Sequence, residues 1–236
     1  MSQACDVLAL SPHPDDTELG CAAALALAAR SGARVVVLSL TNGERASRGN
    51  PQLRREEAAC ADAILGVHER LWLGLPDTEI GAEPGHRMAL IEAIRELRPA
   101  VLLAPWVGDR HPDHAATGRL AREAMELAAI KSIGRGAAFR PRHLFHYFIH
   151  DLAEASFILD ATPVWALKLG AITAHRSQFD AAAPGPETRI SRPDFLTGIE
   201  ARARVWGQTI GTSYGEGLLA AGPVPLTALP GLSPAI

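Results

Sequence analysis

The chain has 236 residues, 47% of them hydrophobic, and a formal net charge of -3, which is the composition of an ordinary soluble globular protein. This charge balance gives no indication of a nucleic-acid partner or of binding to a membrane surface. The length allows a large buried core, and the sequence contains no internal repeat, coiled-coil heptad or clear linker. We therefore expect one domain over residues 1–236, with a C-terminal elaboration.

The start of the chain indicates where the protein resides. The first residues lead directly into a predicted strand, without the basic and apolar regions of a signal peptide. No apolar run approaches the length of a membrane span. We expect a cytoplasmic protein.

A polar segment lies between the first predicted strand and the first predicted helix. An apolar run at residues 6–10 predicts a buried strand, and an alanine-rich run at residues 21–30 predicts a helix. Between them is Ser11-Pro12-His13-Pro14-Asp15-Asp16-Thr17-Glu18-Leu19-Gly20. Imidazole and carboxylate groups suit zinc, and because neighbouring residues point in different directions, one aspartate can bind a metal while the other takes a proton. Alternatively, Asp15 or Asp16 only caps the following helix.

The next elements indicate the fold class. A second strand at residues 33–40 completes a β-α-β unit, which predicts an α/β fold with a Rossmann-like, mostly parallel sheet and helices on both faces. After a polar loop at residues 45–52, residues 54–65 have helical spacing. Arg54 at the start of this helix has two interpretations. It pairs with Glu57 one turn later, or it faces the site and binds an anionic or hydroxylated substrate.

A second histidine-containing segment follows a later strand. The predicted elements before it are a short strand and turn, a helix and a buried strand, at residues 70–77, 87–97 and 101–105. The segment itself is Trp106-Val107-Gly108-Asp109-Arg110-His111-Pro112-Asp113-His114, and a helix at residues 115–128 follows it. If the two strands are neighbours, His13, Asp16 and His114 can converge on one ion with a position left for water, as in catalytic zinc sites. We leave His111 free of the metal.

The C-terminal half carries weaker signals. It predicts strands at residues 143–150 and 156–160 and helices at residues 164–179 and 193–206. His146 and His150 share a face of the first strand, so a second metal site there is conceivable. Residues 180–193 form a candidate lid, and we expect the tail, residues 207–236, to wrap the body or a neighbouring subunit.

The two histidine-containing segments together resemble the PIG-L family of zinc-dependent N-acetylglucosaminyl (GlcNAc) deacetylases, also called LmbE-like proteins. Weaker matches favour the bacillithiol branch of that family. They are Arg54 with Glu57, Leu65 and Gly66; Leu75-Pro76-Asp77; Ala174-His175-Arg176-Ser177-Gln178-Phe179; and Gly215-Glu216-Gly217. One position departs from that branch: Phe195 stands where bacillithiol-type relatives tend to carry Tyr, so a hydroxyl contact to the substrate is missing.

The resemblance implies roles for individual residues. It implies Zn²⁺ held by His13, Asp16 and His114, although the same ligands suit iron, cobalt or nickel. Asp15 would be the general base, and a protonated His111 would face the developing oxyanion.

Three further residues complete the expected site. The resemblance implies that Arg54 and Arg110 contact the substrate. Asp113, beside His111 and His114 in the sequence, is expected to fix the orientation of a histidine ring.

The expected function is that of a metal-dependent hydrolase that removes the N-acetyl group from a GlcNAc conjugate. GlcNAc-malate, an intermediate of bacillithiol biosynthesis, fits the resemblance, and chitobiose-type or mycothiol-type conjugates are alternatives. A non-catalytic metal- or sugar-binding module is a further alternative. A dinucleotide-binding protein is disfavoured because the first turn lacks the G-x-G-x-x-G fingerprint. Members of this family are often hexamers or smaller assemblies, so a homo-oligomer is expected.

Overall fold

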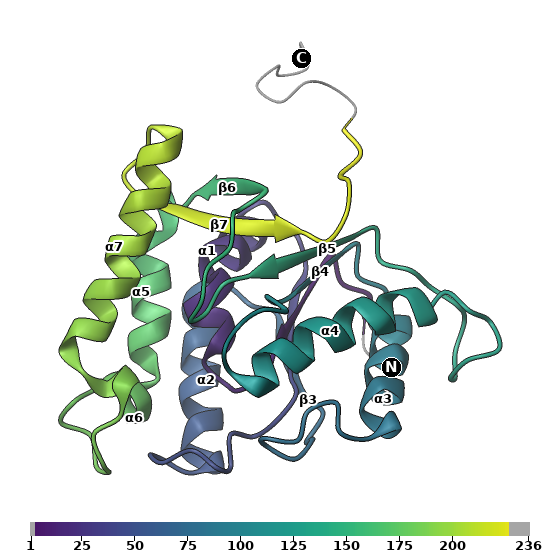
Figure 1. Cartoon of the computed structure of the whole chain (residues 1–236), viewed down its shortest axis with the longest axis horizontal. Helices are drawn as coiled ribbons and strands as arrows, with labels where there is room; N and C mark the ends of the chain where they lie inside the picture. Colours follow the sequence, from purple (N-terminus) through teal and green to yellow (C-terminus); the bar gives the residue numbers. More distant parts are fainter. Residues whose placement is uncertain (1–2, 227–236) are drawn as a thin grey trace.

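A computed structural model describes residues 3–226, which contain a seven-stranded sheet with helices on both faces (Figure 1). The strands are β1 (Val7–Ser11), β2 (Val35–Ser39), β3 (Glu69–Trp72), β4 (Val101–Pro105), β5 (His143–Tyr147), β6 (Phe157–Asp160) and β7 (Gly215–Ala220). The helices are α1 (Asp16–Arg30), α2 (Pro51–Leu65), α3 (Pro84–Leu97), α4 (Pro112–Leu127), α5 (Trp165–Ala174), α6 (Arg176–Phe179) and α7 (Pro193–Ile210). Two short 3₁₀ helices, η1 and η2, span Thr162–Val164 and Arg189–Ser191.

The sheet is mostly parallel. Its strand order is β3-β2-β1-β4-β5-β7-β6. The first five strands in this order pair in parallel, and β7 is antiparallel to both β5 and β6. The apolar runs that predicted the central strands are buried on both faces, as is typical of a parallel sheet covered by two helix layers. The predicted fold class is confirmed.

Two hydrophobic cores lie on opposite faces of the sheet. Along β1, Ala9 packs into the core formed with α1, α2, α5 and α7, whereas Leu8 and Leu10 pack into the core formed with α3 and α4. This alternation follows the period of two of an extended strand. Figure 1 shows the corresponding helix layers on the two sides of the sheet.

The strand order creates a crevice between β1 and β4. The chain leaves β1 toward α1 on one face and leaves β4 toward α4 on the other face. In open α/β sheets, the loops diverge at such a switch point and ligands bind between them. Both histidine-containing segments lie at this switch point.

The C-terminal third differs from the prediction. The predicted helix at residues 164–179 breaks at His175 into α5 and α6, and the strand predicted to reach residue 150 ends at Tyr147. The expected wrapping tail is wrong for residues 207–220: α7 continues to Ile210, and Gly215–Ala220 inserts into the sheet as β7. Two glycines in β7 hid the strand signal, because glycine has low strand propensity. The remainder of the predicted tail from residue 227 lies outside the described residues.

Each helix within residues 3–226 is too short or too polar to span a lipid bilayer.

Candidate metal and catalytic site

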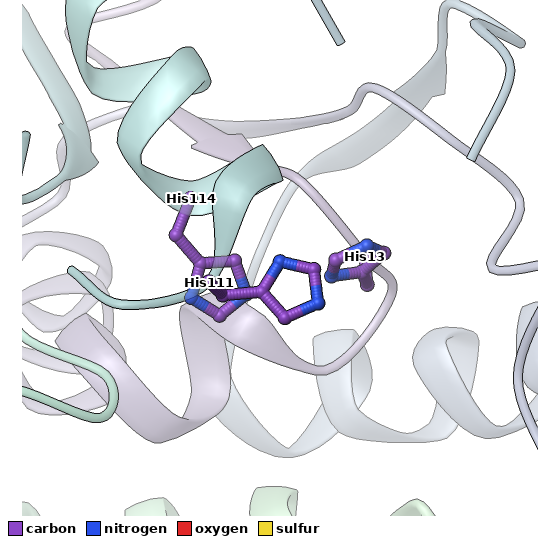
Figure 2. Close-up of side chains that lie close together, drawn as sticks. All are labelled: His13, His111 and His114. Atoms are coloured by element: carbon purple, nitrogen blue, oxygen red, sulfur yellow. The ribbon is translucent and has the colours of Figure 1, made fainter. Parts of the chain in front are cut away.

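Asp16 joins the two histidine-containing segments. Its Oδ2 atom lies 3.0 Å from Nδ1 of His13, and its Oδ1 atom lies 3.2 Å from Nε2 of His114. Figure 2 shows the imidazoles of His13, His111 and His114 grouped between the loop that follows β1 and the first turn of α4. One nitrogen of each ring lies within 4.8 Å of the others. The structure therefore brings together the three predicted metal ligands.

The second nitrogen of each of the two expected histidine ligands faces a carboxylate. Nε2 of His13 lies 3.2 Å from both Asp113 Oδ2 and Asp77 Oδ1, and Nδ1 of His114 lies 3.1 Å from Asp109 Oδ1. Such carboxylate partners fix the ring orientation of metal-binding histidines. The ring that the Asp113 carboxylate contacts is that of His13, and not that of the neighbouring His111 or His114, because the first turn of α4 carries the carboxylate across the crevice.

Asp109 is a functional candidate that sequence reasoning missed. Besides contacting His114, its carboxylate accepts hydrogen bonds from the backbone N–H groups of His111 (3.0 Å) and His150 (2.9 Å). Burial acts to raise the pKa of Asp109, but these hydrogen bonds outweigh it and hold the pKa well below its usual value. Asp109 thus ties the loop after β4 to the loop after β5.

Hydrogen bonds also hold the first loop rigidly. The Pro12 carbonyl accepts a hydrogen bond from Thr41 Oγ1 (2.8 Å), and the Pro14 carbonyl accepts one from Arg70 Nη1 (3.0 Å). Arg70 also forms ion pairs with Glu18 and Asp62. These contacts fix the backbone on both sides of His13 before any metal is bound.

Helix α1 bends where it leaves the site. Cys21 has non-helical dihedral angles, with φ at -139° and ψ at 19°. The bend leaves the Leu19 carbonyl to accept hydrogen bonds from Lys168 Nζ and Arg202 Nη2, each at 3.1 Å. Leu19 itself lines the catalytic pocket. The short first part of α1 is therefore anchored separately from the rest of the helix.

Glu216 of β7 caps the second part of α1. Its carboxylate accepts hydrogen bonds from the backbone N–H groups of Ala23 (3.1 Å) and Ala24 (2.8 Å). The same carboxylate pairs with Lys168 at 2.6 Å, and both side chains are buried. A carboxylate at a helix N-terminus satisfies free backbone donors and complements the helix dipole.

Asp15 lies beside the expected ligands and is held by Arg54. Arg54 Nη2 donates a hydrogen bond of 2.8 Å to Asp15 Oδ1, and both side chains are buried. The alternative Arg54–Glu57 pair does not form, since Glu57 accepts hydrogen bonds from the backbone N–H and hydroxyl of Ser177. Nor does Asp15 act only as a cap: it occupies the N-cap position of α1 without a capping side-chain hydrogen bond.

His111 presents one ring nitrogen to the pocket. Its Nδ1 atom accepts a hydrogen bond from the backbone N–H of Asp113 (3.3 Å), which leaves the ring proton of the neutral form on Nε2. Burial, together with the charges of His114 and His13, lowers the pKa of His111. A neutral His111 is therefore favoured over the expected protonated form, and its Nε2–H remains available as a donor.

His150 joins the site from the loop after β5. Its ring stacks on that of His114 with 5.3 Å between centroids, and burial lowers its pKa to about 4. His146 instead contacts the Pro105 carbonyl through Nδ1. Neither residue belongs to a histidine–carboxylate group able to hold a metal within residues 3–226, so the conceivable second site at these two histidines is wrong.

The charges of the site favour a cation. Burial acts to lower the pKa values of His13 and His114, but the charges of Asp16 and the neighbouring carboxylates outweigh it. They raise the pKa of His114 to about 9 and that of His13 well above 6.5. Burial acts to raise the pKa of Asp16, but the two histidine charges hold it well below 3.8. In the metal-free chain, protons thus balance the carboxylates. A mixed imidazole and carboxylate donor set fits a divalent transition metal, which would replace those protons.

The side chains around Asp16 border a pocket of about 220 Å³. Its lining includes Asp15, His111, Arg54 and Ile190, the last from the candidate lid. Arg110 does not line this pocket and instead borders an adjacent cavity. The structure thus brings Arg54 to the catalytic pocket and leaves Arg110 outside it.

The sequence of this chain is similar to those of known proteins. The family model of PIG-L, described as GlcNAc-PI de-N-acetylase, matches residues 8–125. A diacetylchitobiose deacetylase of Thermococcus kodakarensis is 30% identical over 225 residues, covering 90% of this chain and 81% of the relative. A probable N-acetyl-alpha-D-glucosaminyl L-malate deacetylase 2 of Bacillus subtilis is 30% identical over 190 residues, covering 73% of this chain and 82% of the relative.

A solved structure agrees with these relatives. The conserved protein TT1542 from Thermus thermophilus superposes with a TM-score of 0.87 at 36% identity, covering 98% of this chain and all of that one. The family model includes both histidine-containing segments. The predicted family is therefore confirmed, and the chain belongs to the PIG-L family.

Proposed function

We propose that this chain is a metal-dependent N-deacetylase that hydrolyses the acetamide of a GlcNAc conjugate. The observation that carries the proposal is the contact of one carboxylate, Asp16, with His13 and His114, beside a second carboxylate, Asp15. A mere metal-binding module has no need of the second carboxylate. Relatives named as deacetylases of diacetylchitobiose and of GlcNAc-malate support the type of reaction.

The metal ligands in this proposal are His13, Asp16 and His114. Zinc suits this donor set, and iron, cobalt or nickel are chemically acceptable substitutes. When bound, zinc supplies a nucleophilic water at neutral pH and polarises the amide carbonyl.

Asp15 would move the protons of the reaction. Its Oδ1 atom is occupied by Arg54, and within the described residues Oδ2 accepts no hydrogen bond. Oδ2 would accept the proton of the attacking water and then deliver it to the departing amine, as a general base and then a general acid. Arg54 would keep this carboxylate in a single orientation.

His111 would stabilise the negative charge that develops on the acetamide oxygen. Its Nδ1 atom is engaged by the Asp113 backbone, so the neutral ring carries its proton on Nε2, and His111 lines the pocket that would hold the acetamide. Loss of one such donor typically lowers kcat about 100-fold or more. A neutral imidazole is sufficient for this role.

GlcNAc-malate is the substrate that we propose, and diacetylchitobiose is the main competitor. The Bacillus subtilis relative supports the first, and the Thermococcus relative, which aligns over more of the chain, supports the second. The two differ in charge, since the malate group carries carboxylates and diacetylchitobiose is neutral.

The experiment is an assay of amine release by the zinc-loaded protein. The substrates are GlcNAc-malate, diacetylchitobiose and free GlcNAc, each with and without a chelator. We expect release from a conjugate, loss of release on chelation and recovery when zinc is restored. Absence of release from every substrate, or release that a chelator leaves unchanged, would overturn the proposal.

A further inference from the structure

The catalytic pocket is small for a whole conjugate. Its volume is about 220 Å³, whereas pockets that enclose drug-sized ligands are typically about 300–1,000 Å³. If the proposed function holds, the acetamide enters this pocket, because Asp15 and His111 line it. The aglycone must then extend beyond it.

A second cavity lies next to the catalytic pocket. It has a volume of about 440 Å³, and His150 lines both spaces. Its charged lining residues come from the loop after β4, from η2 and from α7. They are four arginines and one aspartate: Arg110, Arg189, Arg192, Arg202 and Asp194.

Carboxylates offset only part of this positive charge. Arg192 pairs with Glu187 at 2.9 Å. Arg202 donates to the backbone carbonyls of Ile149 and Leu19. Burial lowers its pKa to about 10, so it is still charged at neutral pH.

The other two arginines are free to bind a ligand. Within residues 3–226, the guanidinium groups of Arg110 and Arg189 form no hydrogen bond or ion pair. Guanidinium groups bind carboxylates and phosphates through paired hydrogen bonds, and such charge-assisted bonds are among the strongest in proteins.

The catalytic pocket offers no unpaired arginine. Asp15, Asp16 and Asp77 line it together with its histidines, Arg54 is already paired with Asp15, and Arg45 is paired with Glu79. The second cavity therefore offers unpaired guanidinium groups that the catalytic pocket lacks, so a conjugate would bind with its acetamide inward and its anionic group past His150.

We propose that the second cavity is an anion-binding subsite for the aglycone, and that the substrate is a GlcNAc conjugate carrying a carboxylate or phosphate. This inference rests on the proposed deacetylase function. It assigns recognition of the anion to Arg189 and Arg110, with Arg202 adding charge at the base of the cavity. Arg54 then serves Asp15 and not the aglycone.

The test compares matched charged and neutral substrates. The carboxylate pair is GlcNAc-malate and its dimethyl ester, and the phosphate pair is GlcNAc 1-phosphate and methyl GlcNAc. We expect kcat/KM to be about tenfold or more higher for the anionic member of the preferred pair, mainly through a lower KM. The pair with the larger ratio identifies carboxylate or phosphate as the ligand.

Variants link the preference to the cavity. Arg189→Gln changes an exposed side chain that has no partner, so the fold is retained. Arg202 is not substituted, because its hydrogen bonds to two backbone carbonyls support the fold. Arg189→Gln, alone and with Arg110→Gln, is expected to reduce the anionic-to-neutral ratio. Arg119→Gln, at an exposed arginine of α4 that lines neither space, is the matched control and retains the ratio.

The outcomes separate the subsite from the deacetylase activity. Equal hydrolysis of charged and neutral conjugates would overturn the subsite while the deacetylase stands. If no conjugate is hydrolysed, calorimetric titration of GlcNAc-malate and its dimethyl ester into the zinc-loaded protein tests the subsite alone. Tighter binding of GlcNAc-malate than of its ester, with a difference that Arg189→Gln reduces, supports the subsite. Equal binding of the two compounds contradicts the subsite.

Discussion

The buried carboxylate of Asp15 accepts a hydrogen bond of 2.8 Å from the buried guanidinium of Arg54, at the edge of the catalytic pocket. We predict that Arg54→Gln lowers kcat about 100-fold, because a proton-transfer group that loses its orientation loses about this much rate. Zinc content should not change, since Arg54 contacts none of the three expected ligands. Arg55→Gln, at the exposed neighbour on α2, is the control. Turnover of Arg54→Gln near the wild-type rate would show that Arg54 does not position the base.

Metal affinity should depend on pH with a definite sign. In the metal-free chain the pKa of His114 is raised to about 9 and that of His13 well above 6.5, so both rings are protonated at neutral pH. A metal binds only the unprotonated rings, so each must release its proton. Zinc affinity is therefore predicted to rise as the pH increases toward 9. Calorimetry at pH 7 in buffers of different ionisation enthalpy should detect released protons, and binding without proton release would contradict this account.

Asp109 should control metal affinity without touching the metal. Its carboxylate holds Nδ1 of His114 at 3.1 Å and accepts hydrogen bonds from the backbone N–H groups of His111, His150 and Asp151. We predict that Asp109→Asn weakens zinc binding about 10–100-fold, the usual effect of losing such a partner. Competition with a chelating dye measures this change. The control is Asp151→Asn, because the side chain of Asp151 accepts a hydrogen bond from the Arg110 backbone N–H and contacts none of the expected ligands. This variant should bind zinc as tightly as the wild type.

The cap on the second part of α1 should matter for stability. Glu216→Gln leaves Lys168 buried without its counter-charge and removes one acceptor from the helix N-terminus. Breaking a buried ion pair in this way typically costs about 3–5 kcal/mol of unfolding free energy. Glu200→Gln, in the exposed pair with Arg204 on α7, should change stability by only about 0.5 kcal/mol. Denaturant unfolding of both variants measures the difference, and similar losses would show that Glu216 has no special structural role.

Much of the fold and the expected ligand set could be predicted from the sequence because their signals are local. The central strands are short, nearly continuous apolar runs, and polar residues such as His13 and His114 follow directly where those runs end. Parallel pairing of β1 with β4 then brings the two segments to one edge of the sheet.

The features that sequence reasoning missed depend on contacts between distant parts of the chain. The partner of the Asp113 carboxylate, His13, lies 100 positions earlier, and no local pattern distinguishes it from the adjacent His111 and His114. The strand β7 has glycine at positions 215 and 217, and its pairing with β5 and β6 overrides this low propensity. Asp109 lies in the second histidine-containing segment, but its role depends on the loop after β5, where the backbone N–H of His150 donates a hydrogen bond to it.

The most direct test of the central claim is to measure zinc content and deacetylation together for Asp15→Asn and His114→Ala. The claim is that His13, Asp16 and His114 hold one cation while Asp15 stays unbound and transfers protons. Asp15→Asn should retain its zinc and lose about 100-fold to 10,000-fold in kcat, as expected for removal of a general base. His114→Ala should lose both the zinc and the activity. An Asp15→Asn protein that loses its zinc, or that turns over at nearly the wild-type rate, would contradict the account.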